Sequence, residues 1–380
     1  TKKFFMNKEF QKLLLSNSKF DLVITNDLPY NIAFSILEYR YQCLGVSVLN
    51  HGSASHISWM FGEPFNLANN PETKSPYSDH MTFLETLHNI YLAFISLFVM
   101  YWEMVPQNEQ MLDSFSHSLP FLKNRIPLTD ILKNKSLLII PSDHHVDYNY
   151  ATSNRFKFIP GINLAENKSL SNSYENFIAN STDGVILVSW GSLIRGRNVD
   201  KCEEILWSAF KHLKQKVIWK TRNNKLTSLN SSNIIMSEWV PQNDILGHKN
   251  VILYFSHGGI RSLTEATYHG VPVIVTPFYF DQFKNAKRME ISGAGFLLNY
   301  ADYSVDSVLG AINEVIYNPK YKKEALKRSA SIRDRIIAPT DEAVYWIEYV
   351  LKHGNILKSV ASSLPFYKLY LLDIFGFFII

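Results

Sequence analysis

The second half of the chain alternates short apolar runs with amphipathic segments, and this alternation constrains the fold more than any other feature. The apolar runs lie at 184–189, 216–221, 233–240, 251–256 and 271–278, with helical periodicity at 199–215 and 260–269. Buried strands in this order form a parallel sheet that helices cover on both faces. The pattern predicts a doubly wound α/β domain, in which ligands collect at the carboxyl ends of the strands.

The first half shows the same alternation less regularly. A strand is expected at 20–25, a helix at 32–42, and further strands at 44–50 and 137–142, in the order β-α-β. The apolar segment 82–104 is predicted to be a helix; a core position is favoured, an acceptor-site wall or a membrane-facing surface being the alternatives. We therefore expect two domains, at 1–162 and 176–350, with a linker at 163–175 and a separate segment at 351–380.

Composition limits the function classes. A length of 380 residues suits two domains with real cores, and 46% hydrophobic with 19% charged residues is typical of a folded protein. The formal charge of +4 and the absence of a long basic run do not indicate a nucleic-acid partner. Two cysteines, one in each half, define neither a disulfide framework nor a zinc site.

The sequence FSHGGIRSLTEATYHGVP places His257-Gly258-Gly259 between a strand and a helix that Gly270 would cap. Paired glycines let backbone N–H groups face an anion, and the helix dipole adds positive charge there. The segment therefore predicts a phosphate site, although a tight turn with a solvent-facing histidine would use the same residues.

The flanking segments also carry polar and aromatic groups. Trp239 and Gln242 stand in a strand-to-loop segment, where an indole can stack on a flat base or simply pack in the core. Asp281 and Gln282 follow the next strand, and such a pair suits sugar hydroxyls as well as an ordinary surface loop.

Together, WVPQNDILGH, FSHGGIRSLTEATYHGVP and PFYFDQFKNAKRMEISGAG resemble the signature of the UDP-glycosyltransferase family, in its animal membrane-bound branch. The likeness extends to VSWGS (188–192) and to the segment 338–354, and more weakly to FDLVITNDLPY and 76–106. It implies a GT-B fold, in which two Rossmann-like doubly wound domains face each other across a cleft.

The resemblance also implies roles for single residues in holding a UDP-sugar. Trp239 would stack on uracil, Gln242 would lie by the ribose, and Glu265 would accept hydrogen bonds from the ribose hydroxyls. The diphosphate would contact His257, Gly259, Ser262 and Ser192, and Asp281 with Gln282 would hold the sugar.

Two departures from the family pattern affect the chemistry. Arg261 stands where many relatives have asparagine, and it would either contact a phosphate or point to solvent. The family's catalytic base is a histidine expected before residue 1, so it is absent from this chain. The acidic residue that orients it would be Asp27, displaced by one position, or Asn26 at the ungapped position; an amide orients an imidazole poorly.

The expected function is inverting transfer of a hexose, glucose or glucuronic acid, from a UDP-sugar to a hydroxyl of a small lipophilic acceptor. The UDP-sugar is a co-substrate, and no metal or other cofactor is expected. A non-catalytic UDP-sugar-binding homologue or fragment is the first alternative, and an epimerase or phosphorylase of the same fold is the second.

The apolar run at 366–380 indicates the start of a membrane anchor, with both ends of the natural chain extending beyond this sequence. With the sequons at Asn134, Asn167, Asn180 and Asn230, it predicts an endoplasmic reticulum membrane protein with both domains in the lumen. A homo-oligomer is compatible with this assignment.

Overall fold

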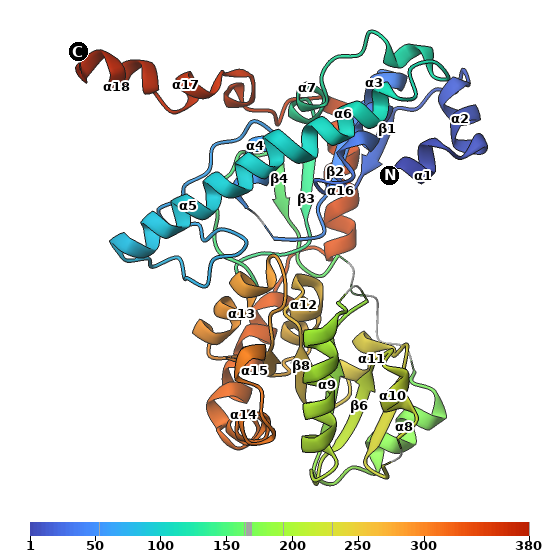
Figure 1. Cartoon of the computed structure of the whole chain (residues 1–380), viewed down its shortest axis with the longest axis vertical. Coiled ribbons are helices and arrows are strands. Elements are labelled where there is room, and N and C mark those ends of the chain that lie inside the picture. Colours follow the sequence, from blue (N-terminus) through green and yellow to red (C-terminus); the bar gives the residue numbers. More distant parts are fainter. Residues whose placement is uncertain (53, 163, 165–168, 193, 230, 380) are drawn as a thin grey trace.

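The computed structural model describes residues 1–52, 54–162, 164, 169–192, 194–229 and 231–379. Two parallel sheets organise the chain, one in each half, and helices surround both (Figure 1). The strands of the first sheet are β1 (Leu22–Thr25), β2 (Leu44–Val48), β3 (Leu137–Ile140) and β4 (Phe156–Phe158). Those of the second sheet are β5 (Val185–Ser189), β6 (Lys216–Lys220), β7 (Ile234–Ser237), β8 (Val251–Ser256), β9 (Val273–Val275) and β10 (Gly295–Leu297). The prediction of two parallel α/β sheets is confirmed.

The second sheet has the strand order β10-β9-β8-β5-β6-β7. The chain therefore leaves β5 in one direction, returns to its other side at β8, and creates a topological switch point between these two strands. Their register pairs Ser189 with Ser256 at the carboxyl ends. The loops that follow β5 and β8 consequently begin side by side.

Both faces of the second sheet are buried. Along β5, Val185 and Leu187 belong to one hydrophobic cluster, and Ile186 and Val188 belong to another. Because successive side chains of a strand point to opposite faces, such a strand needs helices on both sides. The elements of the second half are α8 (Asn172–Ala179), α9 (Arg197–Phe210), α10 (Asn224–Thr227), α11 (Gln242–Leu246), α12 (Ile260–Tyr268), α13 (Gln282–Ile291), a 3₁₀ turn (Tyr300–Asp302), α14 (Val305–Tyr317) and α15 (Pro319–Arg333).

The strands of the first sheet follow one another in chain order, β1-β2-β3-β4. The helices of this half are α1 (Lys2–Phe5), α2 (Lys8–Leu15), α3 (Ile36–Tyr41), α4 (Ser55–Met60), α5 (Phe83–Val99), α6 (Val105–Asp113) and α7 (Leu128–Lys133). Short 3₁₀ segments span Ile32–Ser35 and Pro120–Leu122, and a π-helical turn at Met100–Met104 joins α5 to α6.

The helix α16 (Pro339–His353) returns from the second half and packs on the first sheet (Figure 1). Ala343 and Val350 share a buried cluster with Val46, Leu137 and Ile139. This placement corrects the assignment of residues up to 350 to the second domain, because the apolar face of α16 completes the core of the first domain.

The expected linker is only partly loop. Residues 163 and 165–168 lie outside the described residues, and α8 begins at Asn172. After α16 the chain forms a 3₁₀ turn (Val360–Ser363), α17 (Phe366–Leu369) and α18 (Leu372–Ile379). Ser362 is buried against Gly62 of the first domain, and α18 extends beyond that domain (Figure 1).

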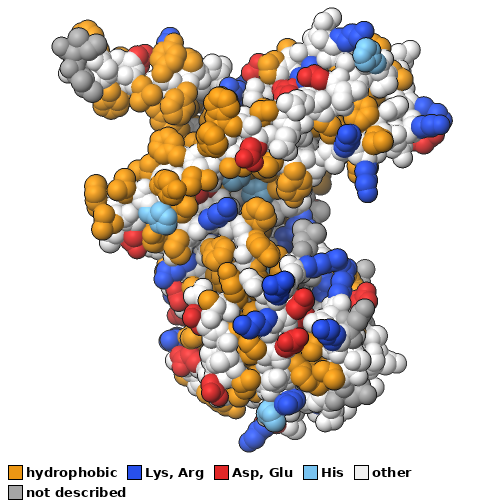
Figure 2. Space-filling view, in the orientation of Figure 1, with side chains coloured by type: hydrophobic (Ala, Val, Ile, Leu, Met, Phe, Trp, Pro, Cys, Tyr) orange, Lys and Arg blue, Asp and Glu red, His pale blue; other side chains and the backbone are white. Residues whose placement is uncertain are grey.

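The favoured core position for the 82–104 helix is wrong. Phe83 is 81% exposed and Trp102 is 71% exposed, and apolar side chains gather on the surface over α5 and the C-terminal segment (Figure 2). By length and composition, the continuous helical stretch Phe83–Asp113 could cross a bilayer. Only 17% of its most apolar 18-residue segment is buried. The sequence pattern identified an apolar helix at 82–104. Such a pattern does not show whether another element packs on the helix and buries its apolar side chains.

Candidate functional site

The switch point of the second sheet holds a histidine between two glycines. A Cβ on Gly191, in the loop after β5, would lie 2.9 Å from Cε1 of His257 in the loop after β8. A Cβ on Gly259 would lie 2.5 Å from Nε2 of the same ring. Both glycines are therefore needed to seat the imidazole, and Gly191 also has a φ of 75°, which glycine adopts at little cost.

The imidazole of His257 is neutral near pH 7. Burial lowers the pKa of His257 to about 4, with a further lowering by the charge of Lys220. Gly259 is the N-cap of α12, and no side chain among the described residues caps this helix end. Uncapped N–H groups, a neutral imidazole donor and the helix dipole together favour an anion here.

A hydrogen-bonded group of side chains lies along the start of α11 and α12. Nε2 of Gln242 is 2.6 Å from Oε2 of Glu265 and 3.1 Å from Oγ of Ser262. Tyr254 donates its hydroxyl to Oε1 of Gln242 at 3.1 Å. Burial raises the pKa of Glu265, and the hydrogen bond from Gln242 opposes this rise. Gln242 therefore fixes the position of a carboxylate that can accept from ligand hydroxyls.

Trp239 is not a core residue. Its side chain is 70% exposed, and Nζ of Lys220 lies 4.6 Å from its ring centroid. Lys220 supports the indole through a cation–π contact. This arrangement suits a stacking platform better than the alternative of core packing.

Asp281 and Gln282 stand at the start of α13, and both are tied to their surroundings. Asn285 donates to Oδ2 of Asp281 at 2.9 Å and to the carbonyl oxygen of Gly258 at 2.9 Å. Gln282 uses Oε1 to accept from the backbone N–H groups of Phe278 and Tyr279, at 2.8 and 3.0 Å. Because these bonds fix Oε1 of Gln282, they also fix the orientation of its amide NH₂ group. Asn285 links Asp281 to the His257-Gly258-Gly259 turn.

The backbone just before Asp281 adopts an uncommon conformation. Phe280 has a φ of 52°, in the left-handed region that a non-glycine residue rarely occupies. Such strain concentrates at functional sites, where neighbouring structure holds it in place. Here the hydrogen bonds of Gln282 to the preceding residues hold the turn.

Ser192 lies in the exposed loop after β5, next to Gly191. This loop lines a cavity of about 330 Å³ at the carboxyl ends of β5 and β6, together with Glu203, Lys220 and Glu238. The predicted donor-site residues thus come from the loops after β5, β7, β8 and β9 and from the helices α11, α12 and α13, at the carboxyl ends of the strands of the second sheet.

Arg261 is exposed, in keeping with the solvent-facing alternative, and it also contacts the first domain. Its guanidinium donates to Oδ1 of Asn50, just after β2. Arg288 on α13 likewise donates to the carbonyl oxygen of His144 at 2.6 Å. The carboxyl-end loops of the first sheet therefore meet the helices that surround the donor-site residues.

Asp27 lies in the first domain, in a fully buried group of its own. Oδ2 accepts from Oγ1 of Thr25 at 2.8 Å and lies 2.9 Å from Nζ of Lys135, and Oδ1 accepts from Ser35 at 2.8 Å. Lys135 also pairs with Glu38. The neighbouring Asn26 has its Oδ1 buried, without a hydrogen-bond partner among the described residues. The role of Asp27 in orienting a histidine stays a prediction.

One group of side chains has the composition of a metal site. The ligand atoms of Asp143, His144 and His145 lie within 4.8 Å of one another. However, His145 already pairs with Asp143 at 2.8 Å through Nδ1 and with Ser331 at 2.9 Å through Nε2. The guanidinium of Arg328 also donates to the carbonyl oxygen of His145. Hydrogen bonding between the domains accounts for this group.

Sequence reasoning missed Lys220, Tyr254 and Asn285. Lys220 and Tyr254 belong to apolar strands, and the alternating sequence pattern identifies them as strand residues without indicating a role in the site. Asn285 could have been found, because it follows Asp281 by four residues on a helix and such positions share a face.

The comparisons with known proteins agree with this geometry. The family model described as "UDP-glucoronosyl and UDP-glucosyl transferase" matches residues 1–380. The chain is 34% identical over 376 residues to UDP-glycosyltransferase UGT5 of Dactylopius coccus, covering 97% of this chain and 70% of that protein. It is 32% identical over 374 residues to UDP-glucuronosyltransferase 1A1 of Mus musculus, covering 98% of this chain and 68% of that protein.

Solved structures show the same fold. Os79 from O. sativa in complex with UDP superimposes with a TM-score of 0.61 at 16% identity, covering 90% of this chain and 81% of the other. The glycotransferase of kitacinnamycin also gives a TM-score of 0.61, at 15% identity, covering 90% of this chain and 79% of the other. These neighbours confirm the GT-B fold predicted from the sequence. By its sequence across the whole length, this chain belongs to the UDP-glucoronosyl and UDP-glucosyl transferase family.

Proposed function

We propose that this protein transfers a hexose from a UDP-sugar to a hydroxyl group of a small lipophilic acceptor, with inversion at the anomeric carbon. One observation carries the proposal. Trp239 and Gln242 follow β7, whereas the His257 turn and Glu265 follow β8, yet Gln242 bonds to Glu265 across the two connections. An aromatic platform, a carboxylate and a helix N-terminus match a base, a ribose and a diphosphate.

The donor would extend across these residues. Uracil would stack on the exposed face of Trp239, and the ribose hydroxyls would donate to Glu265. His257, Ser262, Ser192 and the backbone at Gly259 would surround the diphosphate. Asp281 and Gln282, tied to the same turn through Asn285, would contact the sugar hydroxyls.

The reaction forms a bond between the acceptor oxygen and the anomeric carbon as the bond from that carbon to the diphosphate breaks. The acceptor proton passes to a general base, a role that the family resemblance gives to a histidine. Negative charge grows on the departing UDP, where the α12 N-terminus and the neutral His257 can donate hydrogen bonds to it. We propose that no metal ion is required, so a chelator should leave UDP affinity unchanged.

Calorimetric titration with UDP tests the donor site. Wild-type protein should bind UDP, and Glu265→Ala should weaken binding about 10- to 100-fold, because hydrogen bonds to a charged group contribute about 1.5–3 kcal/mol. Glu290→Ala is the matched control, since this helical glutamate pairs with Lys287 at the surface. Equal UDP affinity in wild type and Glu265→Ala would refute the ribose role.

We also propose attachment to the endoplasmic reticulum membrane with both domains in the lumen. The apolar stretch Phe83–Asp113 and the exposed phenylalanines of α18 support a membrane location. Asn134 and Asn180 are exposed, as glycan acceptors must be. Expression in animal cells should give protein that resists carbonate extraction and loses mass on endoglycosidase H treatment. A carbonate-soluble, unglycosylated product would refute this placement.

A further inference from the structure

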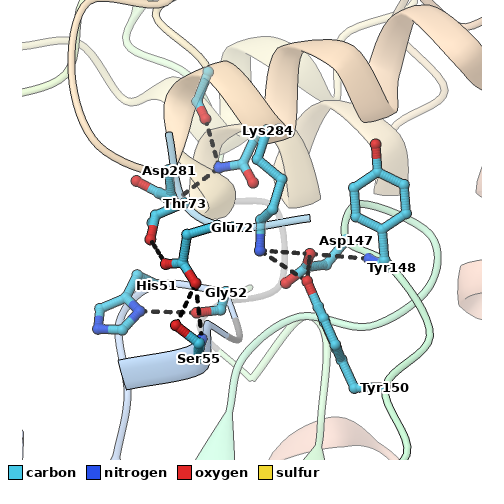
Figure 3. Close-up of polar contacts among 12 residues, drawn as sticks. His51, Gly52, Ser55, Glu72, Thr73, Asp147, Tyr148, Tyr150, Asp281 and Lys284 are labelled. Carbon is cyan, nitrogen blue, oxygen red and sulfur yellow. Dashed lines mark hydrogen bonds and ion pairs between the residues drawn. The ribbon is translucent and has the colours of Figure 1, made fainter. Parts of the chain in front are cut away.

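A buried lysine beside the proposed sugar position is held by the first domain. Lys284 is fully buried on α13, two residues after Gln282. Its Nζ lies 3.0 Å from Oδ1 of Asp147 and donates to the hydroxyl oxygen of Tyr150 at 2.8 Å (Figure 3). Asp147 and Tyr150 belong to the loop between β3 and β4. The ion pair therefore joins the two domains next to Asp281 and Gln282.

The loop presents Asp147 in a fixed position. Its Oδ1 accepts from the backbone N–H of Tyr148 at 2.9 Å and from the hydroxyl of Tyr150 at 2.6 Å. The side chain of Asp147 is as fully buried as that of Lys284. Because a buried charge is costly unless it is paired, Lys284 and Asp147 each depend on the other.

Gly52 of the first domain lies against the pair. A Cβ at this position would stand 2.1 Å from Oδ2 of Asp147 and 3.3 Å from Nζ of Lys284. Residue 52, in the loop after β2, must therefore be a glycine for the backbone to approach this closely. Because residue 52 has no side chain, the Asp147 carboxylate can occupy the space beside Lys284.

The other basic side chains described around the pair have partners of their own, and His56 faces Glu72 at 3.6 Å. Burial lowers the pKa of His51 to about 4, so this imidazole is neutral. Burial acts to raise the pKa of Glu72, but the imidazole of His56, 3.6 Å away, and hydrogen bonds from Ser55 and Thr73 hold the pKa below its usual range. Glu72 is therefore a carboxylate.

Two arginines of the second domain, Arg261 and Arg288, also have partners in the first domain. Arg261 donates to Asn50, and Arg288 donates to His144 and lies 5.3 Å from the ring of Tyr148. Asp281 adds a carboxylate at the start of α13, within the electrostatic range of both Lys284 and Asp147. An anionic sugar beside Asp281 would meet a carboxylate, and the charge of Lys284 is already paired with Asp147.

We infer that the Lys284–Asp147 pair makes the donor site selective for a neutral UDP-hexose over a UDP-hexuronate. The C6 carboxylate of a hexuronate would need a cation, and Asp147 already pairs with Lys284, which stands two residues after Gln282 on α13. A C6 hydroxyl carries no charge and needs only hydrogen-bond partners. This inference rests on the proposed UDP-sugar site and concerns the sugar alone.

Calorimetric titration of the whole chain with UDP, UDP-glucose and UDP-glucuronate separates the two claims. We expect UDP-glucose to bind at least tenfold more tightly than UDP-glucuronate. No binding of UDP would overturn the proposed function and this inference with it. Binding of UDP with equal or higher affinity for UDP-glucuronate than for UDP-glucose would overturn the inference alone.

Variants of the pair test its cause. Asp147→Asn should leave UDP affinity unchanged and reduce the preference for UDP-glucose at least fivefold, because Lys284 can then face the sugar. Gly52→Ala should shift the preference in the same direction by displacing the Asp147 carboxylate, and it provides a second route if Asp147→Asn does not fold. An unchanged preference in a folded variant of either kind would overturn the inference.

Two controls separate this effect from general loss of stability. Asp147→Glu keeps the charge, and it should keep the wild-type preference. Glu63→Gln removes a carboxylate from another buried ion pair, with Arg155 at 2.7 Å inside the first domain. It should lower stability without changing the ratio of the two affinities, and a changed ratio in Glu63→Gln would count against the role of Lys284.

Discussion

The ring of His257 occupies the space that a side chain on Gly259 would need. The Cβ position of Gly259 lies 2.5 Å from Nε2 of His257, well inside van der Waals contact. Gly259 is also the residue whose backbone begins α12. Because Gly259 has no side chain, the imidazole of His257 fits beside it, and an anion can approach the N-terminus of α12.

Gly259→Ala should weaken UDP binding at least tenfold, because the added methyl must displace the imidazole or the helix end. Gly310→Ala is the matched control, since Gly310 stands on α14 with nothing within 4 Å of its Cβ position. That control should be neutral or slightly stabilising, by about 0.5–1 kcal/mol. Titration calorimetry and denaturant unfolding measure the two effects, and unchanged UDP affinity in Gly259→Ala would contradict the proposed seat for the diphosphate.

Trp239→Ala should weaken UDP binding about 2- to 10-fold, since aromatic stacking contributes about 0.5–1.5 kcal/mol beyond burial. Trp102→Ala on the apolar helix is a control of equal exposure, at 71% against 70% for Trp239. UDP should also change the tryptophan fluorescence of the wild type and of Trp102→Ala, and should do so less in Trp239→Ala. The same change in both variants would show that the base stacks elsewhere.

Stability should fall as pH rises because of Glu203. Burial raises the pKa of Glu203 from 4.5 to about 7, against the opposing hydrogen bonds of Thr221 and Asn223. Between pH 4.5 and about 7, Glu203 keeps its proton in the native state but loses it in the unfolded chain. The free energy of unfolding therefore decreases by up to about 3 kcal/mol as the pH rises through this range. Glu203→Gln should remove this part of the pH dependence in urea unfolding between pH 4.5 and 8.

The exposed neighbour Glu204 on the same helix provides the control for that measurement. Glu204→Gln should leave the wild-type pH profile intact. Comparison with wild type also cancels the contribution of His51 and His257, whose lowered pKa values act in the opposite direction. Parallel profiles for wild type and Glu203→Gln would contradict the assignment.

Asp27→Asn should reduce the free energy of unfolding by about 3–5 kcal/mol, because it removes one carboxylate from the fully buried Lys135. Asp21→Asn, on an exposed residue just before β1, should change it by less than about 0.5 kcal/mol. Equal urea midpoints for the two variants would contradict the structural role. In a longer protein that carries the base histidine, unchanged turnover in a folded Asp27→Asn variant would refute the orienting role.

Much of the second domain could be predicted from its sequence, because local signals specify it. Alternating apolar runs located β5, β6, β7, β8 and β9. The prediction that Gly270 ends α12 in a left-handed conformation was also correct, because its φ is 64°. The donor-site residues lie where strands end, and parallel topology brings such ends together.

Contacts between distant segments could not be predicted in this way. Tyr150 and Lys284 are 134 residues apart, and Thr25 and Lys135 are 110 apart. No periodicity links such residues, and a lysine in a polar helix gives no sign that a loop of the other domain will bury it. The exposure of α5 was missed for the same reason, since burial depends on a partner element that the segment itself does not encode.

The return of α16 to the first sheet gives the protein a core that is discontinuous in sequence. A truncation placed after α15, intended to leave both domains intact, would uncover Val46 and Ile139 in the half that was not cut. Separate production of the first domain would require residues 339–353 to be supplied in trans or grafted onto its end. Digestion at the exposed Ile336–Ile337 junction should therefore yield two pieces that stay together until a denaturant separates them.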